Sequence, residues 1–241
     1  MQRLFFSDVH LSPTRPERTR RLLALLRSRT PGAREIYILG DLFDYWIGPK
    51  HLELPDYREA LDALRRTTAD GVRVVFLKGN RDFYMGGFAE GTGVETAPDG
   101  ARHEIRAGRQ RVLLCHGNYL DCRPRLAHLP EEIIRSRLVE SVYTRLPASV
   151  AKRGAAFYRR VSGHGARRQR AAVRAAQRLS RRALDALFRE GFDVVVCGHF
   201  HRPAKYVLKF EGQEKTLFTL GDWTDGSSYL VEENGAWRLF G

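Results

Sequence analysis

Cysteine is scarce in this sequence, with only Cys115, Cys122 and Cys197 among 241 residues. So few cysteines, odd in number, argue against a disulfide framework and favour a reducing compartment such as the cytoplasm. The sequence also lacks any Cys-x-x-Cys pair. That absence argues against a structural zinc site.

Long apolar runs are missing as well. No uninterrupted apolar stretch approaches the 18 residues that a membrane-spanning helix needs. The apolar run near the N-terminus stops at Ser7-Asp8, so we expect no secretion signal there. Internal repeats and low-complexity linkers are absent. The length fits a single domain that has room for an insertion.

Acidic residues are few relative to basic ones, with 28 Asp plus Glu against 41 Lys plus Arg and a net charge of +13. Residues 123–190 contain 17 basic and 5 acidic residues, and so carry +12 of this excess. We therefore predict a nearly neutral framework, residues 1–122 and 191–241, with a basic insertion at 123–190. The excess indicates an acidic partner, which is nucleic acid, a phosphorylated substrate or an anionic membrane surface.

The insertion has helical periodicity. Over residues 167–190 one side of the predicted helix carries the arginine stripe, made of Arg170, Arg174, Arg178 and Arg182. Small or apolar residues fall on the opposite side. The stripe is either the solvated face of a helix packed on the core or a surface that faces anions or a membrane. Few aromatic residues interleave with the arginines, which disfavours a nucleic-acid reader.

The framework alternates between strands and helices, which predicts an α/β fold. Strands are predicted over residues 3–8, 35–41 and 72–80, and helices over 17–29 and 57–70. Residues 103–108 and 110–117 read as a hairpin. After the insertion, strands are predicted over 192–199, 204–210, 215–223 and 228–233. An Asn-Gly turn then leads to a last strand over 234–240.

Five successive strands end in Asp, Asn or His. The residues are Asp8 and His10, Asp41 and Asp44, Asn80 with Arg81 and Asp82, His116, and finally His199 and His201. Any one of them alone is a common cap, turn or satisfied polar residue. Because the carboxyl ends of parallel strands form the ligand crevice of an α/β sheet, we expect the five groups to meet.

Imidazole, carboxylate and amide oxygen together suit first-row ions such as Mn²⁺, Fe²⁺ or Zn²⁺. Seven such ligands are too many for one ion and fit two ions with one carboxylate shared. Two ions about 3.5–4 Å apart stabilise the attacking and leaving oxygens of a phosphoryl displacement. The pattern therefore predicts a dimetal hydrolase.

The motifs "DVH", "GDLFD", "GNRD", "CHGN" and "GHFH" occur in this order between residues 8 and 201. The chain thereby resembles the calcineurin-like metallophosphoesterases. With Arg81 in the third motif, it is most similar to the UDP-2,3-diacylglucosamine pyrophosphohydrolases of lipid A synthesis. The resemblance implies layered β-sheets flanked by helices, with a helical cap between the fourth and fifth motifs. It also implies two Mn²⁺ ions and cleavage of an acylated UDP-sugar to UMP and 2,3-diacylglucosamine 1-phosphate (lipid X).

The resemblance further assigns roles to the motif residues. One ion would be bound by Asp8, His10, Asp41 and His201, and the other by Asp41, Asn80, His116 and His199. Substrate contacts would come from Asn80, Arg81 and Asp121, whereas Asp44 and Asp82 would orient ligands. Location on the cytoplasmic face of an inner membrane is also implied.

The chain departs from that family after the fourth motif, where "NYLDCRPRLAHLP" has Asp121 as its only acid. A related hydrolase for another nucleotide-diphospho compound or phosphodiester is therefore the alternative. A nucleic-acid-binding protein or nuclease is more distant, and we expect no nucleic-acid partner. The sequence leaves the oligomeric state open.

Overall fold

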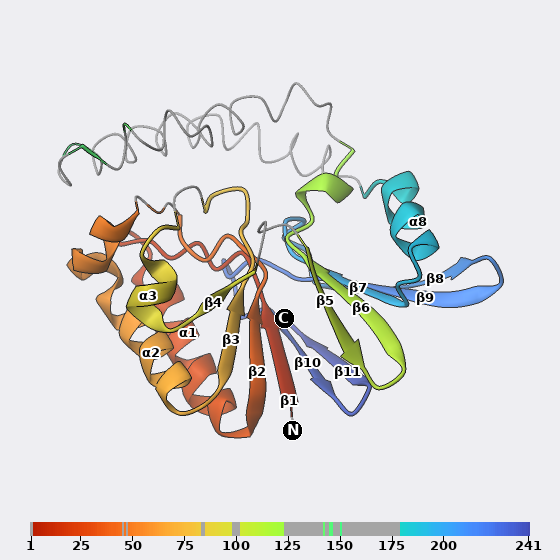
Figure 1. The fold of residues 1–241 in the computed structure, drawn as a ribbon, viewed down its shortest axis with the longest axis horizontal. Helices are drawn as coiled ribbons and strands as arrows, with labels where there is room; N and C mark the ends of the chain where they lie inside the picture. Colours follow the sequence, from red (N-terminus) through yellow and green to blue (C-terminus); the bar gives the residue numbers. More distant parts are fainter. Residues whose placement is uncertain are drawn as a thin grey trace.

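The computed structural model describes residues 2–44, 46, 48–82, 85–97, 102–122, 142, 145–146, 150 and 179–241. Within these residues the chain forms two β-sheets with helices on their outer faces, which confirms the expected α/β class (Figure 1). The first sheet has the strand order β11-β10-β1-β2-β3-β4, and the second has the order β5-β6-β7-β9-β8.

The first sheet contains β1 (Gln2–Phe6), β2 (Ala33–Ile38), β3 (Arg73–Phe76), β4 (Glu95–Thr96), β10 (Tyr229–Glu233) and β11 (Ala236–Phe240). Its strands β1 to β4 are parallel, and β10 joins β1 antiparallel. Helices α1 (Pro16–Arg29), α2 (Arg58–Ala69) and α3 (Phe88–Thr92) cover one face of it (Figure 1). Pro16 at the first helical position and Arg29 in the last turn favour α1 at its two ends.

The second sheet contains β5 (Arg102–Ala107), β6 (Gln110–Cys115), β7 (Val194–Cys197), β8 (Ala204–Phe210) and β9 (Gln213–Thr219). The expected hairpin is β5–β6, while β6, β7 and β9 run parallel. Helix α8 (Arg181–Arg189) buries Leu184, Leu187 and Phe188 against the outer face of this sheet.

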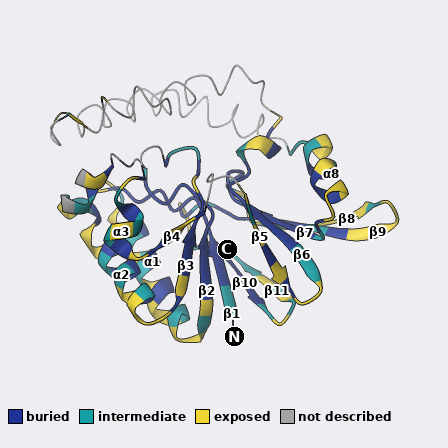
Figure 2. Ribbon diagram, viewed as in Figure 1, coloured by how far each residue is buried: buried dark blue, intermediate teal, exposed yellow. Residues whose placement is uncertain are grey.

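Alternation along the strands divides the core into three layers. Phe5 of β1 points between the two sheets, whereas its neighbours Leu4 and Phe6 point to α1 and α2. In β6, Leu114 likewise lies between the sheets and Cys115 faces α8. Figure 2 shows the result, strands buried through the middle of the molecule and exposed outer faces on the helices. Strands buried on both faces read as continuous apolar runs, as in parallel sheets generally.

The structure corrects one sequence expectation, a continuous helix over residues 167–190. Leu179 instead forms an isolated β-bridge with Asp121, and α8 begins only after Ser180. The Ser180 hydroxyl accepts a hydrogen bond from the Ala183 backbone N at 3.3 Å, so it caps the new helix. Of the arginine stripe, only Arg182 lies among the described residues, where it is exposed on α8. Most of the predicted insertion lies outside the described residues.

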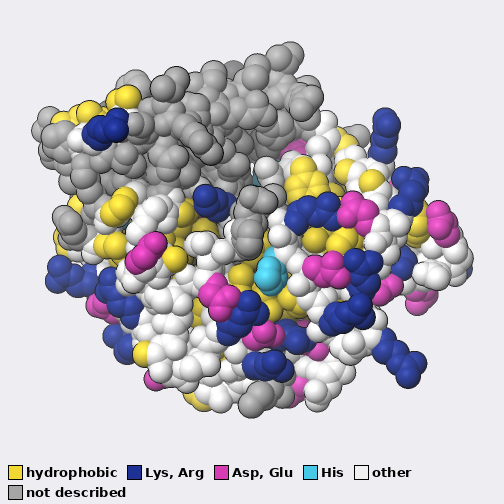
Figure 3. Space-filling model, in the orientation of Figure 1, with side chains coloured by type: hydrophobic (Ala, Val, Ile, Leu, Met, Phe, Trp, Pro, Cys, Tyr) yellow, Lys and Arg dark blue, Asp and Glu magenta, His cyan; other side chains and the backbone are white. Residues whose placement is uncertain are grey.

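On the face drawn in Figure 3, charges of both signs are mixed over the described surface. Among the described residues, no helix is long and apolar enough to cross a membrane.

Candidate metal centre

The carboxyl ends of strands from both sheets meet at one end of the molecule. Within the first sheet, the backbone N of Asp8 donates to Gly40 O at 3.1 Å, and His10 N donates to Asp41 O at 3.0 Å. Between the sheets, His199 N donates to Asp8 Oδ2 at 2.9 Å. The loops that follow β1, β2 and β7 therefore form one connected structure.

Most of the strained backbone lies in these loops. Among the described residues, seven non-glycine residues have a positive φ, and five of them are predicted metal ligands: Asp8, His10, Asp41, His199 and His201. A side chain in this left-handed region costs of order 1–3 kcal/mol, and such strain gathers at functional sites. The positive φ at these positions redirects the backbone just after each strand ends, where the predicted ligands lie.

Two glycines allow the loops to approach closely. A Cβ at Gly79 would overlap the Asp41 backbone and carboxylate, and one at Gly198 would overlap Ser7 Oγ and Asp8 Oδ2. The Gly that precedes Asn80 and the Gly that precedes His199 are thus required by packing.

A first cluster consists of Asp8, His10 and His201, whose ligand atoms lie within 4.8 Å of one another. His201 Nε2 lies 3.2 Å from Asp8 Oδ1, and His10 Nε2 lies 3.9 Å from the same oxygen. The Asp8 side chain is fully buried. Its Oδ2 accepts hydrogen bonds from Ser7 Oγ and His199 N, which leaves Oδ1 facing the two rings.

A second cluster consists of Asp8, Asp41 and His116. His116 Nδ1 donates to Leu39 O at 2.8 Å, so the lone pair of the neutral ring is on Nε2. That Nε2 lies 3.8 Å from Asp41 Oδ1 and 2.7 Å from Asn80 Oδ1. The predicted ligand Asn80 therefore joins this cluster.

Asp41 lies between the two clusters. Its Oδ2 is 3.8 Å from His10 Nε2, and its Oδ1 is 3.8 Å from His116 Nε2. Asp8 is also common to both clusters, but only its Oδ1 is left without a hydrogen bond. Each oxygen of Asp41 thus faces a different cluster, which is the arrangement expected of the predicted bridging carboxylate.

The donor set fits divalent cations. Asp8 Oδ1 and His10 Nδ1 are buried and have no hydrogen-bond partner. Two carboxylates with at most 2% of their side chains exposed need positive charge nearby, because a buried charge without a partner costs several kcal/mol. Oxygen and imidazole nitrogen are the ligands of first-row ions. The residues present therefore fit two such ions.

A family model described as calcineurin-like phosphoesterase matches residues 1–203. The chain belongs to this family. Full-length relatives agree with the match. A UDP-2,3-diacylglucosamine hydrolase of Stenotrophomonas maltophilia is 36% identical over 99% of this chain and 98% of its own length. Hydrolases of the same name from Aeromonas salmonicida and Pseudomonas paraeruginosa are 34% and 32% identical. The alignments cover 99% and 98% of this chain, and 92% and 97% of those relatives.

His199 lies at the edge of this phosphoesterase centre. Its ring is 5.3 Å from that of His116, centroid to centroid, but its nitrogens belong to neither cluster among the described residues. Nε2 lies 3.1 Å from Asp121 Oδ2, so Nε2 carries the proton and Nδ1 the lone pair. Asp121, predicted as a substrate contact, is thus a buried neighbour of a predicted ligand. Its contact with substrate stays a prediction.

Two further carboxylates orient the ligands. Asp82 Oδ2 accepts from the backbone N of Asp41 at 2.6 Å and of Gly79 at 2.8 Å, contacts that agree with the orienting role, which stays a prediction. Asp222 Oδ2 lies 3.4 Å from His201 Nδ1 and so directs Nε2 toward Asp8. Sequence reasoning missed Asp222. The signal was present, because "LGDW" after β9 repeats the pattern of an acid at a strand end.

Arg81 lies at the mouth of the centre. Its backbone N donates to Asp41 Oδ1 at 2.8 Å, and its Nε lies 3.9 Å from Asp41 Oδ2. The side chain is 37% exposed. It therefore reaches both the carboxylate of the predicted ligand Asp41 and the solvent from which a substrate would come.

Electrostatics set the protonation of the ligands. Burial lowers the pKa of His10 to about 4, so this ring is neutral near pH 7. Burial alone would lower the pKa of His201 too, but the charges of Asp8 and Asp222 raise it to about 10. Burial and the charge of Asp41 raise the pKa of Asp82 to about 7. The positive charge of protonated His201 therefore lies beside the Asp8 carboxylate.

Proposed function

We propose that this phosphoesterase hydrolyses the pyrophosphate bond of UDP-2,3-diacylglucosamine and releases UMP and 2,3-diacylglucosamine 1-phosphate. The main support for this choice of substrate is the full-length sequence identity to hydrolases of that name. The reaction class is supported by the family match and by the cluster of buried carboxylates and imidazoles.

One ion would be held by Asp8, His10, Asp41 and His201, and the other by Asp41, Asn80, His116 and His199. We propose Mn²⁺ for both, which suits this mixture of oxygen and nitrogen ligands. Ions bound there would supply Lewis acidity toward the phosphoryl oxygens and lower the pKa of water.

The residues of the chain perform the remaining tasks. Arg81 binds substrate phosphate, because a guanidinium offers two parallel hydrogen bonds and keeps its charge. Asp82 and Asp222 hold ligands in place through the contacts given above. Asn80 and Asp121 border the position of the second ion, where they would contact the substrate.

The basic insertion would be the cap over the acyl chains. We propose that it also holds the protein against the anionic cytoplasmic face of the inner membrane. Basic residues near such a surface contribute about 1 kcal/mol each. Support comes from the +12 charge of residues 123–190.

A hydrolysis screen with product identification tests the substrate. The Mn²⁺-loaded protein would be given UDP-2,3-diacylglucosamine, UDP-N-acetylglucosamine, a cyclic nucleotide and a bis-aryl phosphate, with Asp41→Ala as the metal-site control. We expect UMP and the acylated sugar phosphate to form fastest from the first compound. Faster turnover of another compound would replace this assignment with the related-hydrolase alternative, which the departure after the fourth motif favours.

A further inference from the structure

Arg18 is a charged residue buried beside the metal centre that the proposed chemistry leaves without a role. It lies in the first turn of α1 and is only 3% exposed. Its Nη1 donates to the carbonyl oxygens of Val9 at 3.3 Å and His10 at 3.1 Å, and its Nη2 donates to Thr224 Oγ1 at 3.0 Å. These three hydrogen-bond partners are all neutral groups, and no ion pair of Arg18 is found among the described residues.

Burying a guanidinium on neutral partners is costly. The planar guanidinium presents its two Nη atoms in a fixed geometry, so the buried Arg18 can hold two loops at once. One nitrogen holds the loop after β1, which carries His10 in its strained positive-φ conformation. The other nitrogen holds the loop after β9, which carries Asp222. A planar fork can join two loops in this way, whereas an ammonium cannot keep the same geometry.

The contacts form a directed chain to the second histidine of the first cluster. Arg18 donates to the Thr224 hydroxyl, and that hydroxyl donates to Asp222 Oδ2 at 3.0 Å. The backbone N of Thr224 also faces Asp222 Oδ1 at 3.4 Å. Asp222 Oδ2 in turn lies 3.4 Å from His201 Nδ1. The two hydrogen bonds from Arg18 to Thr224 and from Thr224 to Asp222 have a defined direction, and Asp222 then contacts His201, so Arg18 reaches His201 through two intermediates.

We propose that Arg18 is a positioning residue for one of the two ions, because it sets His10 through its backbone and His201 through Thr224 and Asp222. This inference rests on the proposed metal centre. It adds a residue of α1, outside every sequence motif, to the support of that centre. Only the ion held with His10 and His201 depends on it, and the ion near His116 does not.

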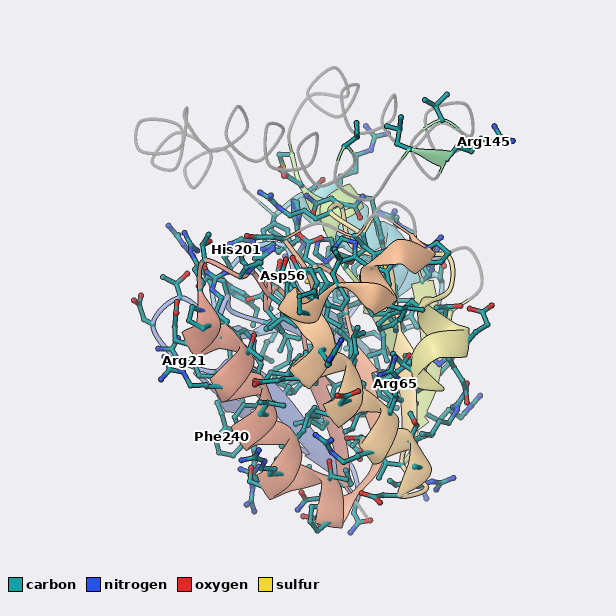
Figure 4. The ribbon with its side chains drawn as sticks, turned by 90° about the vertical axis from the view of Figure 1, so that its left-hand side faces the viewer. Arg21, Asp56, Arg65, Arg145, His201 and Phe240 are labelled. Atoms are coloured by element: carbon teal, nitrogen blue, oxygen red, sulfur yellow. The ribbon has the colours of Figure 1, made fainter. Side chains whose placement is uncertain are left out.

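The same helix provides a matched control. Arg21, one turn further along α1, donates to Trp223 O at 2.7 Å and Thr224 O at 3.0 Å. It therefore anchors the same loop, but within the described part of the chain it makes no hydrogen bond or ion pair with His10. Figure 4 shows Arg21 on α1, with His201 above it at the end where the helix begins.

The test measures Mn²⁺ binding to the metal-free full-length proteins by electron paramagnetic resonance of free Mn²⁺. Thermal unfolding of each protein would be measured in parallel. The variants are Arg18→Met, Arg18→Lys, Thr224→Val and the control Arg21→Met. Thr224 is exposed and Val has its shape, so Thr224→Val keeps the test valid even where Arg18→Met does not fold.

We expect Arg18→Met and Thr224→Val to weaken one of two Mn²⁺ sites by about 10–100-fold, as loss of a ligand-orienting partner does. The other site keeps the affinity of the parent. Arg18→Lys should restore the affinity only in part. Arg21→Met should bind both ions with the affinity of the parent, even if its melting temperature is lower. For a small phosphodiester, kcat of Arg18→Met falls at low Mn²⁺ and recovers at high Mn²⁺.

Parent-like affinity at both sites in Thr224→Val and Arg18→Lys would overturn the inference. Equal weakening in Arg21→Met would also overturn it, because loop anchoring in general would then be the cause. A parent that binds two Mn²⁺ ions but leaves UDP-2,3-diacylglucosamine intact would instead refute the proposed substrate and leave the role of Arg18 standing.

Discussion

Asp41 differs from Asp44, three residues along the chain, in what its carboxylate faces. Both Asp41 oxygens face predicted ligand nitrogens at 3.8 Å, one in each cluster. We expect Asp41→Ala to lower kcat by well over 100-fold at saturating Mn²⁺, since loss of a mere orienting partner already costs 10–100-fold. Asp44→Ala should lose less, about 10–100-fold at most, as expected of a partner that only orients a ligand. Steady-state rates on the diacylated substrate decide this, and similar rates for both variants would remove Asp41 as the bridge.

Arg81 gives a second prediction at this scale. An ammonium cannot form two parallel hydrogen bonds to a phosphate, and a hydrogen bond to a charged group is worth about 1.5–3 kcal/mol. Arg81→Lys should therefore lower kcat/KM by about 10–100-fold. Metal content, measured by elemental analysis, should equal that of the parent because Arg81 is no ligand. Joint loss of metal and activity would show that Arg81 supports the ions.

The sequence alone predicted the residue types of the centre and the neighbouring Asp82, but neither Asp222 nor the strained backbone of the loops. Asp8, Asn80 and His116 were predicted because each follows an apolar strand, and the structure brings them together. Asp222 was missed, although it too follows a strand, because its partner His201 lies 21 positions earlier. Positive φ at Asp8 and His201 had no signal in the sequence, since φ depends on the contacts of the folded loops.

At the scale of elements, the loop after β3 depends on Gly79. A Cβ there would overlap Asp41. We expect Gly79→Ala to lower the free energy of unfolding by about 1–3 kcal/mol, as overpacking does, and to abolish binding of at least one Mn²⁺ ion. Gly226→Ala is the control, because nothing lies within 4 Å of its added Cβ. Chemical denaturation with parallel Mn²⁺ titration measures both effects. Intact metal binding in Gly79→Ala would contradict the close approach of these loops.

An ion-pair network ties the strands of the first sheet together. Glu35 on β2 accepts from Arg3 on β1 at 2.6 Å and faces Arg73 on β3 at 3.3 Å. Burial alone would raise the pKa of Glu35, but the hydrogen bonds from Arg3 and Arg73 lower it below its ordinary value of 4.5. The folded protein thus binds this proton less readily than the unfolded chain. The stabilisation is complete above pH 4.5 and is lost as pH falls through the folded pKa.

Glu35→Gln tests this linkage. At pH 7 the variant should be less stable than the parent by about 1–3 kcal/mol, the range for hydrogen bonds to charged groups. The difference should shrink as pH falls below 4.5. Thermal unfolding of the metal-free proteins between pH 3 and 7 would show it. A difference that is independent of pH would mean that the charge of Glu35 contributes nothing.

Element prediction succeeded where the pattern was long. The strand from Ala204 to Phe210 and the hairpin of β5 and β6 were predicted almost to the residue. Helix α3 and strand β4 were not predicted, because five and two residues are too short for a period to emerge. The division into two sheets was not foreseen from periodicity, since buried parallel strands are apolar on both faces. Ser180 did carry a capping signal that the longer apolar period obscured.

At the scale of the whole molecule, the concentration of positive charge in residues 123–190 predicts binding to anionic membranes. Replacing the arginine stripe, Arg170, Arg174, Arg178 and Arg182, with Gln should weaken binding to anionic vesicles by orders of magnitude, because about 1 kcal/mol per residue adds up. Added salt should weaken binding of the parent likewise. Hydrolysis of a small soluble phosphodiester should hardly change. Vesicle co-sedimentation measures the effect.

A matched variant separates position from net charge. Arg20, Arg27, Arg34 and Arg66 are exposed on or near α1 and α2, outside the insertion. Their replacement with Gln removes the same charge and should leave vesicle binding much closer to that of the parent. Equal loss in both variants would assign the effect to net charge. A lower melting temperature of the stripe variant with unchanged vesicle binding would assign the stripe to the fold.

We propose that two ions, held at the strand ends where the two sheets meet, are required for the hydrolysis. The most direct measurement titrates the metal-free protein with Mn²⁺ while the bound ions are counted and release of UMP from UDP-2,3-diacylglucosamine is followed. We expect two ions to bind per chain, with full activity only when the second has bound. In Asp41→Ala we expect neither two bound ions nor full activity. Full activity in the metal-free protein, or with a single bound ion, would contradict it.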